Sequence, residues 1–309
     1  MTQRQRTAGA ASEPAPSATG IGQAGAHHGE ILQGLFSVDG ALVRGLVTLP
    51  CPLFESEARV ELDRGRPEIT VLPAWKVKAG RAARLALDAL GFGQAGARVA
   101  LDGGVPVSRG FGSSTSDVVA TVRAVCAAVG AGLEDLEIAR LAVQSEVASD
   151  PLMFDRAVLF AQRDGVLLED FGVPVPAFEV LGFSTSRNEA GISTVAFAPA
   201  SYSARETEEF GELRRQLHAG LGRGDAEAVG SVATASARIN QRHLPVPAFA
   251  ELTRIIPAAG AVGLQVAHSG DVAGLLFDRR DAECPSRVAE AEKLVAACGI
   301  TRTWRFATS

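Results

Sequence analysis

A glycine- and serine-rich segment, Pro106 to Asp117, constrains the fold of this chain more than any other stretch. Gly110 and Gly112 lack a Cβ atom, so the backbone can turn sharply there and come close to a ligand. Hydroxyl residues follow, and an apolar run from Val118 to Val129 predicts a buried helix that ends at Gly130. A helix N-terminus with unpaired N–H groups suits an anion, and hydroxyls that can hold a metal ion favour a nucleotide phosphate.

Two structural interpretations of the same segment need no ligand. A glycine loop between a strand and a helix is often only a tight turn. Ser114 and Asp117 also fit a capping box, in which side chains bond to backbone N–H groups at the start of a helix. A cap and a phosphate site can coexist at one helix N-terminus, so the segment alone leaves both open.

The composition predicts a globular protein with a core of its own. The chain has 309 residues, of which 47% are hydrophobic, and this length fits one large domain or two of ordinary size. A formal charge of −5 argues against a broad nucleic-acid surface, and no apolar run reaches the length of a membrane span. The polar first stretch has no signal-peptide core, and four scattered cysteines suit a reducing compartment. We therefore expect a cytoplasmic protein without nucleic-acid or membrane partners.

Hydrophobic spacing and chain breakers divide the sequence into helices and hairpin-like strand pairs. Residues 1–25 are small and polar without periodicity, which predicts a disordered tail, and residues 27–36 are expected to form a turn around Glu30. Strands are expected at 42–49, 58–62, 69–72, 98–101, 158–161, 166–168, 180–185, 194–197, 262–267, 272–277 and 301–306. Helices are expected at 75–90, 118–129, 133–147, 205–219, 225–242 and 285–298. With Pro174 and Pro176 as a boundary, this pattern predicts an α+β protein of two domains.

The glycine segment does not match the phosphate loops of the commonest nucleotide-binding proteins. A Walker A loop requires GxxxxGK followed by Ser or Thr, and the sequence contains no such match. In the dinucleotide fingerprint GxGxxG, Gly110 and Gly112 fit, but Thr115 stands in place of the third glycine. The HRD and DFG segments of protein kinases are missing from the sequence as well. A nicotinamide-dependent oxidoreductase is therefore the weakest of the alternatives.

The arrangement Pro-x-x-x-Gly-x-Gly-Ser-Ser resembles the second motif of the GHMP small-molecule kinases, the superfamily of galactokinase, homoserine kinase, mevalonate kinase and phosphomevalonate kinase. The segment Gly29 to Gly34 (GEILQG) is similar to the first motif of the branch that contains the L-threonine kinases of cobalamin side-chain synthesis. The segments Ser236 to Leu244 and Gly263 to Gly274 also resemble that branch, the latter its third motif. The three motifs occur in the expected order, so the resemblance extends from about Ala26 to the C-terminus.

The resemblance implies a fold of two domains with the active site between them. Residues 26–175 would form the ATP-binding domain, similar to domain 2 of ribosomal protein S5, and residues 176–309 a ferredoxin-like domain. ATP would be the phosphoryl donor, with Mg²⁺ as its metal ion. The acceptor would be a small hydroxylated metabolite, first of all a hydroxy amino acid such as L-threonine, which would give O-phospho-L-threonine.

The resemblance also implies a set of site residues. The ATP phosphates would be held by Pro106, Ser108, Arg109, Gly110, Phe111, Gly112, Ser113, Ser114 and Thr115. Ser114 and Glu146 would bind Mg²⁺, which prefers oxygen ligands, and Asp150 would orient or deprotonate the acceptor hydroxyl. These three residues are the catalytic candidates. The acceptor would contact His28, Glu30, Gln33, Asp150, His268, Ser269 and Gly270.

The sequence also departs from the family pattern. His28 stands where the threonine-kinase branch usually has cysteine, and Thr115, Ser116 and Asp117 replace smaller residues. These departures leave open another acceptor (homoserine, serine or a sugar-like alcohol) and a nucleotide-binding relative without catalysis. A homodimer is left open too.

The candidate residues have structural interpretations as well. Lys76 and Lys78 are candidates for contact with the nucleotide, but they also fit solvated helix residues, as Glu146 does. Asp150 before Pro151 fits a turn former. The tandem histidines at 27 and 28 fit a surface position, and His268 fits a hydrogen-bonded histidine between strands.

Overall fold

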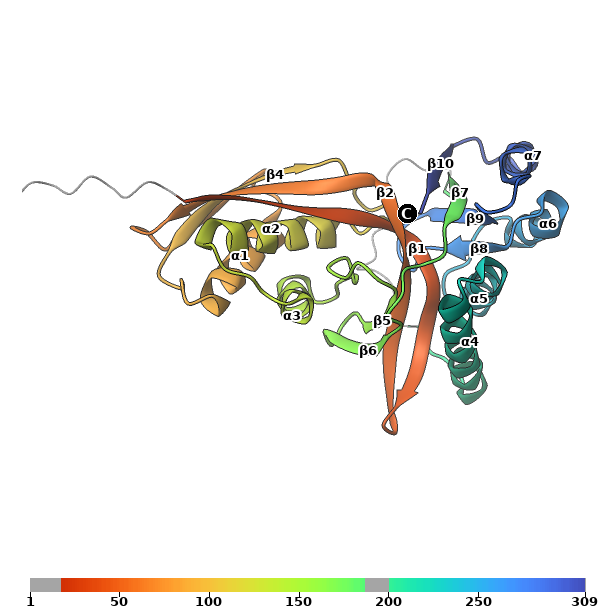
Figure 1. Ribbon diagram of the computed structural model, residues 1–309, viewed down its shortest axis with the longest axis horizontal. Helices are drawn as coiled ribbons and strands as arrows, with labels where there is room; N and C mark the ends of the chain where they lie inside the picture. Colours follow the sequence, from red (N-terminus) through yellow and green to blue (C-terminus); the bar gives the residue numbers. More distant parts are fainter. Residues whose placement is uncertain (1–17, 187–199, 309) are drawn as a thin grey trace, which may run out of the picture.

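The computed structural model describes residues 18–186 and 200–308, which form a mixed sheet with helices packed against it (Figure 1). The strands are β1 (Thr19–Val38), β2 (Ala41–Asp63), β3 (Ile69–Leu72), β4 (Gly96–Gly103), β5 (Val158–Ala161), β6 (Val166–Asp170), β7 (Phe178–Ser184), β8 (Gly263–Val266), β9 (Val272–Asp278) and β10 (Thr303–Ala307). The helices are α1 (Val77–Ala89), α2 (Ser113–Val129), α3 (Asp135–Glu146), α4 (Ala204–Arg223), α5 (Ala226–Asn240), α6 (Phe249–Ala259) and α7 (Cys284–Ala297). The α+β class expected from the sequence is confirmed. The strand expected at 194–197 lies outside the described residues.

Two long antiparallel strands, β1 and β2, organise the molecule. They pair from Thr19 opposite Glu61 to Val38 opposite Ala41. The sheet order is β10-β7-β9-β8-β1-β2-β4-β3, and β5 joins β2 to β6. β1 meets β8 where Glu30 pairs with Val266, so the sheet is continuous between the two halves of the chain (Figure 1). The domain boundary proposed after residue 175 falls between β6 and β7 and stays a prediction.

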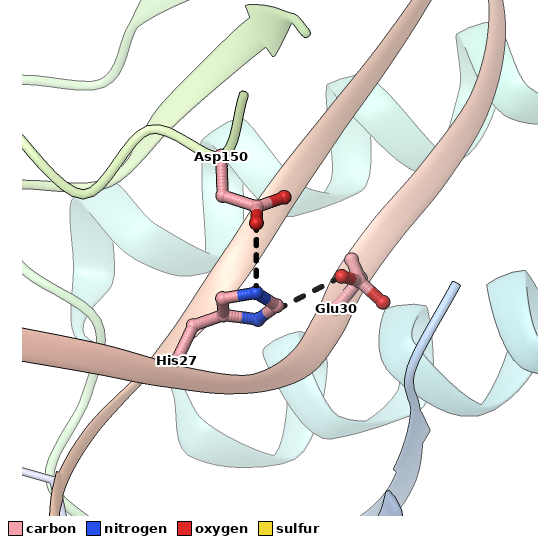
Figure 2. Close-up of side chains that lie close together, drawn as sticks. All are labelled: His27, Glu30 and Asp150. Atoms are coloured by element: carbon pink, nitrogen blue, oxygen red, sulfur yellow. Dashed lines mark ion pairs between the residues drawn. The ribbon is translucent and has the colours of Figure 1, made fainter. Parts of the chain in front are cut away.

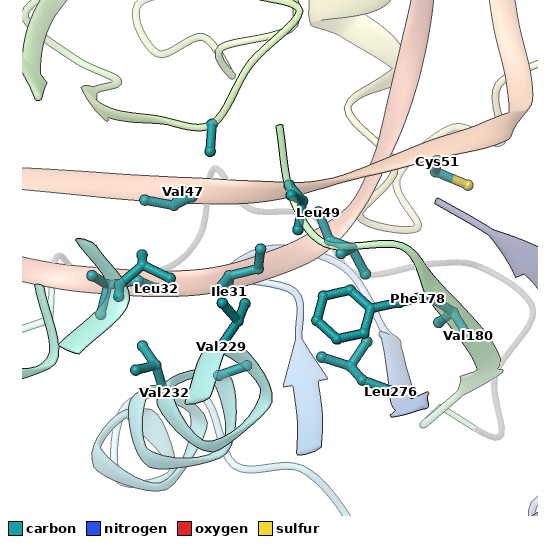
Figure 3. Close-up of a cluster of buried hydrophobic side chains, with 14 of the residues drawn as sticks. Ile31, Leu32, Val47, Leu49, Cys51, Phe178, Val180, Val229, Val232 and Leu276 are labelled. Atoms are coloured by element: carbon teal, nitrogen blue, oxygen red, sulfur yellow. The ribbon is translucent and has the colours of Figure 1, made fainter. Parts of the chain in front are cut away.

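The helices cover the sheet in three groups, each with its own buried cluster. α1, α2 and α3 pack against β4, the first half of β1 and the second half of β2, around a core rich in alanine and valine. α4 and α5 pack on the second half of β1, where Val229 and Val232 lie beside Ile31 and Leu32 (Figure 3). α6 and α7 cover β7, β8 and β9. Among the described residues, no helix combines the length and apolar character that crossing a membrane requires.

The expected disordered tail is too long at its C-terminal end, because β1 begins at Thr19 and residues 19–25 pair with β2. The buried positions of this segment are Gly20, Gly22, Ala24 and Ala26, which alternate with exposed residues. A Cβ atom added at Gly22 would lie 2.3 Å from the backbone oxygen of Ala120 in α2. The small residues are therefore required by close packing of strand on helix, although their composition is typical of a tail.

Three other expectations are corrected. Residues 27–36 belong to β1, in which register shifts at His27 and Glu30 replace the expected turn. The two strands expected at 42–49 and 58–62 are parts of β2. Helix α6 was not expected, because Pro257, which has no backbone N–H for a helical hydrogen bond, interrupts the helical sequence pattern in its last turn.

Candidate active site

The glycine- and serine-rich segment leads directly into α2, the helix that lies beneath the first half of β1. Gly110 and Gly112 have φ of +98° and +73°, a left-handed conformation that favours glycine. The first helical bond of this turn runs from Ser116 N–H to the Gly112 carbonyl, so the N–H groups before Ser116 have no acceptor within the helix. This helix start has the backbone geometry of an anion site.

A cleft of about 450 Å³ opens beside this loop. Its walls come from the loop, the start of α1, the end of α3 with the residues after it, and the turn between β8 and β9. The residues expected at the site that line it are Ser108, Gly110, Phe111, Gly112, Ser113, Ser114, Thr115, Glu146, Asp150, His268, Ser269 and Gly270. Segments that are distant in the sequence thus converge on one cavity.

The Ser114 hydroxyl and the Glu146 carboxylate converge at the floor of the cleft. Ser114 Oγ donates to Glu146 Oε2 over 2.5 Å, and Lys78 Nζ lies 2.9 Å from that hydroxyl and 3.4 Å from the carboxylate oxygen. Burial raises the pKa of Glu146, against the hydrogen bonds from Ser114 and Thr115. The ammonium group of Lys78 lies beside both the Ser114 hydroxyl and the Glu146 carboxylate. A hydroxyl and a carboxylate oxygen are ligands that fit Mg²⁺.

A single hydroxyl, that of Thr115, joins Glu146 and Asp150, two of the acidic residues that line the cleft. Its Oγ1 donates to Glu146 Oε1 over 2.7 Å and accepts from the backbone N–H of Asp150 over 3.2 Å. Thr115 is 2% exposed, so this bridge is buried. The threonine that departs from the usual sequence pattern therefore fixes the spacing between Glu146 and Asp150.

Behind the cleft, His27 lies between two carboxylates (Figure 2). Its Nε2 is 3.1 Å from Asp150 Oδ2, and its Nδ1 is 3.8 Å from Glu30 Oε1. Burial opposes the charged forms of both members of the first pair, but their mutual attraction raises the pKa of His27 and lowers that of Asp150 to about 2. Asp150 therefore presents an ionised carboxylate to the cleft.

Glu30 in turn holds His268. Its Oε1 is 2.6 Å from His268 Nδ1, and its Oε2 accepts from the His268 backbone N–H over 2.5 Å. Burial would lower the pKa of this imidazole, but the charge of Glu30 raises it to about 9. Four side chains of alternating charge, those of His268, Glu30, His27 and Asp150, thus connect two sides of the cleft.

Comparison with known proteins agrees with this geometry. Residues 77–155, which include α1, the glycine loop, α2 and α3, match the family description "GHMP kinases N terminal domain". Residues 77–155 therefore carry the N-terminal domain of the GHMP kinases. It is 26% identical over 219 residues to an L-threonine kinase of Salmonella typhimurium, covering 67% of each chain. It is 27% identical over 284 residues to an L-threonine kinase of Citrobacter freundii, covering 84% of this chain and 86% of the relative.

Solved structures show the same fold. A homoserine kinase from Cytophaga hutchinsonii superposes with a TM-score of 0.68 and 17% identity, over 97% of each chain. A mevalonate kinase from L. major superposes with a TM-score of 0.59 and 18% identity, over 96% of this chain and 97% of the other. The protein is an ATP-dependent small-molecule kinase, as the sequence motifs predict.

His28 is one of the expected acceptor residues that the structure places outside the cleft wall. It is 0% exposed and packs among Phe111, Trp304 and Phe306. Trp304 Nε1 donates to its Nε2 over 3.1 Å, and the Gln265 amide contacts its Nδ1. Burial lowers the pKa of His28 to about 3, so this imidazole is a neutral core residue of the kinase.

Four more expected residues lie outside the cleft wall. The backbone of Gln33 bonds to Ser236 and Asn240, which anchors β1 to α5. Glu30 is buried behind His268, and Pro106 is outside the lining of the cleft. Arg109 turns to Asp271, with NH1 2.7 Å from Oδ2, while Asp271 N–H donates to the Arg109 carbonyl.

The contacts between Arg109 and Asp271 join the glycine loop to the turn after β8. An added Cβ atom at Gly270 would lie 2.1 Å from the Arg109 carbonyl carbon, and one at Gly110 would lie 2.2 Å from the Ser269 oxygen. Both glycines are thus required by a close approach of two backbones, and the pair of segments forms what we call the clasp, residues 109–110 and 269–271.

Sequence reasoning missed His27 and undervalued two lysines. Lys78 lines the cleft beside Glu146, and Lys76 Nζ lies 2.8 Å from Asp117, which also accepts from Ser56. The capping-box interpretation of Asp117 is therefore wrong, because its carboxylate faces Lys76 and not the helix N-terminus. The sequence signal that could have indicated His27 is its position three residues before Glu30, the residue that it contacts in the structure.

Proposed function

We propose that this kinase transfers the γ-phosphoryl group of ATP to the side-chain hydroxyl of L-threonine, giving O-phospho-L-threonine. Both L-threonine kinases reported above support this acceptor, since they match 67% and 84% of this chain. The observation that carries the proposal is the position of Asp150: an ionised carboxylate lies in the same cleft as the glycine loop, joined to the start of α2 by Thr115. Phosphoryl transfer needs this proximity of an acceptor-binding group and a phosphate site.

The loop residues 108–115 would hold the ATP phosphates through backbone N–H groups at the start of α2. Ser114 and Glu146 would hold Mg²⁺, and the ammonium group that now bridges them marks the point as a cation site. When bound, the ion supplies neutralisation of phosphate charge. Lys78 is close enough to add a further positive charge there.

Asp150 would accept a hydrogen bond from the acceptor hydroxyl and orient its oxygen. A carboxylate with a pKa of about 2 is a weak base, so orientation comes first and proton transfer follows as the new phosphate ester forms. His27 keeps this carboxylate ionised without lining the cleft itself.

The test is incubation with ATP, Mg²⁺ and one alcohol at a time, with mass analysis of the product. L-Threonine, L-serine, L-homoserine and galactose form the panel. We expect phosphorylated L-threonine as the main product. A higher kcat/KM for homoserine, serine or the sugar than for L-threonine would show that L-threonine is not the preferred acceptor, although the protein would still be a kinase of small alcohols. The absence of a phosphorylated product from every alcohol would contradict the whole proposal.

A further inference from the structure

His268 uses one imidazole nitrogen inside the protein and leaves the other for the cleft. Its Nδ1 faces Glu30, which is 2% exposed and holds the backbone of the same histidine as well. Because Nδ1 is engaged, Nε2 is the remaining polar atom of the ring. Among the described residues it has no hydrogen-bond partner, and it is not one of the buried unpartnered atoms, so it is accessible where His268 lines the cleft.

The charges around this ring favour the imidazolium form. Glu30 lies against it and Asp150 is close enough to act on it, whereas burial, Arg163 and the neighbouring His27 oppose the positive charge. The pKa of about 9 agrees with this arrangement. An N–H group on a cation, held in one orientation by a buried carboxylate, is a binding group for a small anion.

We propose that His268 binds a carboxylate of the acceptor through Nε2–H, so that the kinase selects alcohols that carry a carboxylate. Asp150 binds the hydroxyl of the same molecule from another part of the cleft wall. Glu30 is a positioning residue, since it fixes the ring without lining the cleft. This inference rests on the proposed function for the reaction and adds the residue that recognises the carboxylate of the acceptor.

The experiment compares L-threonine with (R)-1-aminopropan-2-ol, which has the same hydroxyl and amino groups and no carboxylate. For the wild-type chain we expect kcat/KM to favour L-threonine by about tenfold or more, the range of one charge-assisted hydrogen bond. In His268→Asn the side-chain amide can still meet Glu30, but no atom replaces Nε2. This preference should shrink about tenfold in the variant, through a higher KM for L-threonine.

A Glu30→Gln variant tests the positioning role, because its amide can still contact His268 but carries no charge. It should show a smaller loss of preference in the same direction, with KM changed more than kcat. His218→Asn is the matched control, since His218 Nδ1 also lies 2.6 Å from a glutamate oxygen, that of Glu169, outside the cleft. This control should keep the wild-type preference.

Four results would overturn the inference. A wild-type chain that takes both alcohols equally well would do so and leave the kinase proposal standing. Equal losses with both alcohols in His268→Asn would show that the residue does not bind the carboxylate. A rise in KM for ATP alone would assign Nε2 to the phosphates. No phosphorylation of any alcohol would remove the proposed function and this inference together.

Discussion

His27 Nε2 lies 3.1 Å from Asp150 Oδ2, and this contact joins strand β1 to the segment after α3. The imidazole is 1% exposed and the carboxylate reaches the cleft, so the pair is one charged unit with only its acidic end available to a ligand. Removal of either member would leave the other as an uncompensated buried charge.

His27→Gln should lower kcat about tenfold or more and move the acidic limb of its pH profile upward. Burial favours protonated Asp150, and His27 is the main group that opposes it; the wild-type pKa of about 2 should therefore rise in the variant. Activity that the wild type keeps at mildly acidic pH would then be lost. A profile of kcat against pH measures this, with His218→Gln as control, and an unchanged acidic limb would contradict the role of His27.

Ser114→Ala and Glu146→Gln should each weaken metal-dependent turnover while leaving the fold intact. Ser114→Ala removes the hydroxyl that meets Glu146 beside Lys78, and Glu146→Gln removes the negative charge and one of the two carboxylate oxygens, so the Mg²⁺ concentration at half-maximal rate should rise about tenfold or more. Magnesium titration of the rate gives the value, and circular dichroism checks folding. Ser231→Ala, an exposed hydroxyl on α5, is the control. An unchanged titration in either variant would remove that residue from the metal site.

The KM for L-threonine should rise with pH above about 9 while the KM for ATP changes less. The raised pKa of His268 means that its positive charge is present below about pH 9 and lost as pH increases through this value. The binding of a carboxylate therefore weakens on the alkaline side. Steady-state kinetics at saturating ATP tests this, and Glu30→Gln should shift the rise to lower pH. A KM for L-threonine that stays flat across this range would refute it.

Gly22→Ala should destabilise the protein by about 2 kcal/mol or more, because the methyl group meets the backbone of α2. The added Cβ would lie 2.3 Å from both the Ala120 oxygen and the Ala124 nitrogen. Gly25→Ala is the matched control on the same strand, since no heavy atom lies within 4 Å of its Cβ position. Urea denaturation measures both free energies of unfolding. Equal stability of the two variants would show that α2 does not require a glycine at position 22.

The sequence alone predicted the loop, the helix after it and most residues of the cleft, because those features depend on local chemistry. Gly110, Gly112 and the serines carry their conformation and their donors with them. The first strand was missed because a glycine that packs on a helix has the same composition as a glycine in a tail. Composition does not encode a partner that lies about a hundred residues away.

The separate positions of the two histidines could not be predicted from the sequence for a similar reason. The family resemblance assigned His28 to the acceptor site, and the sequence alone favoured a surface position for both histidines, whereas the register shifts between Gly25 and Leu32 decide where each ring points. The bulged backbone directs His27 to Asp150 and His28 to Trp304. A one-residue shift in a strand reverses the face of each side chain, and this shift is set by tertiary pairing.

The clasp has a consequence for recombining this protein with its relatives. The bend that would hold ATP takes its shape from Gly270 and Asp271, more than 150 residues downstream of Arg109 and Gly110. A chimera that joins the amino-terminal half of this chain to a foreign carboxyl-terminal half would contain the glycine loop without residues 269–271, the segment that packs against it. Crossovers in this fold should therefore be chosen so that both segments of the clasp come from one parent.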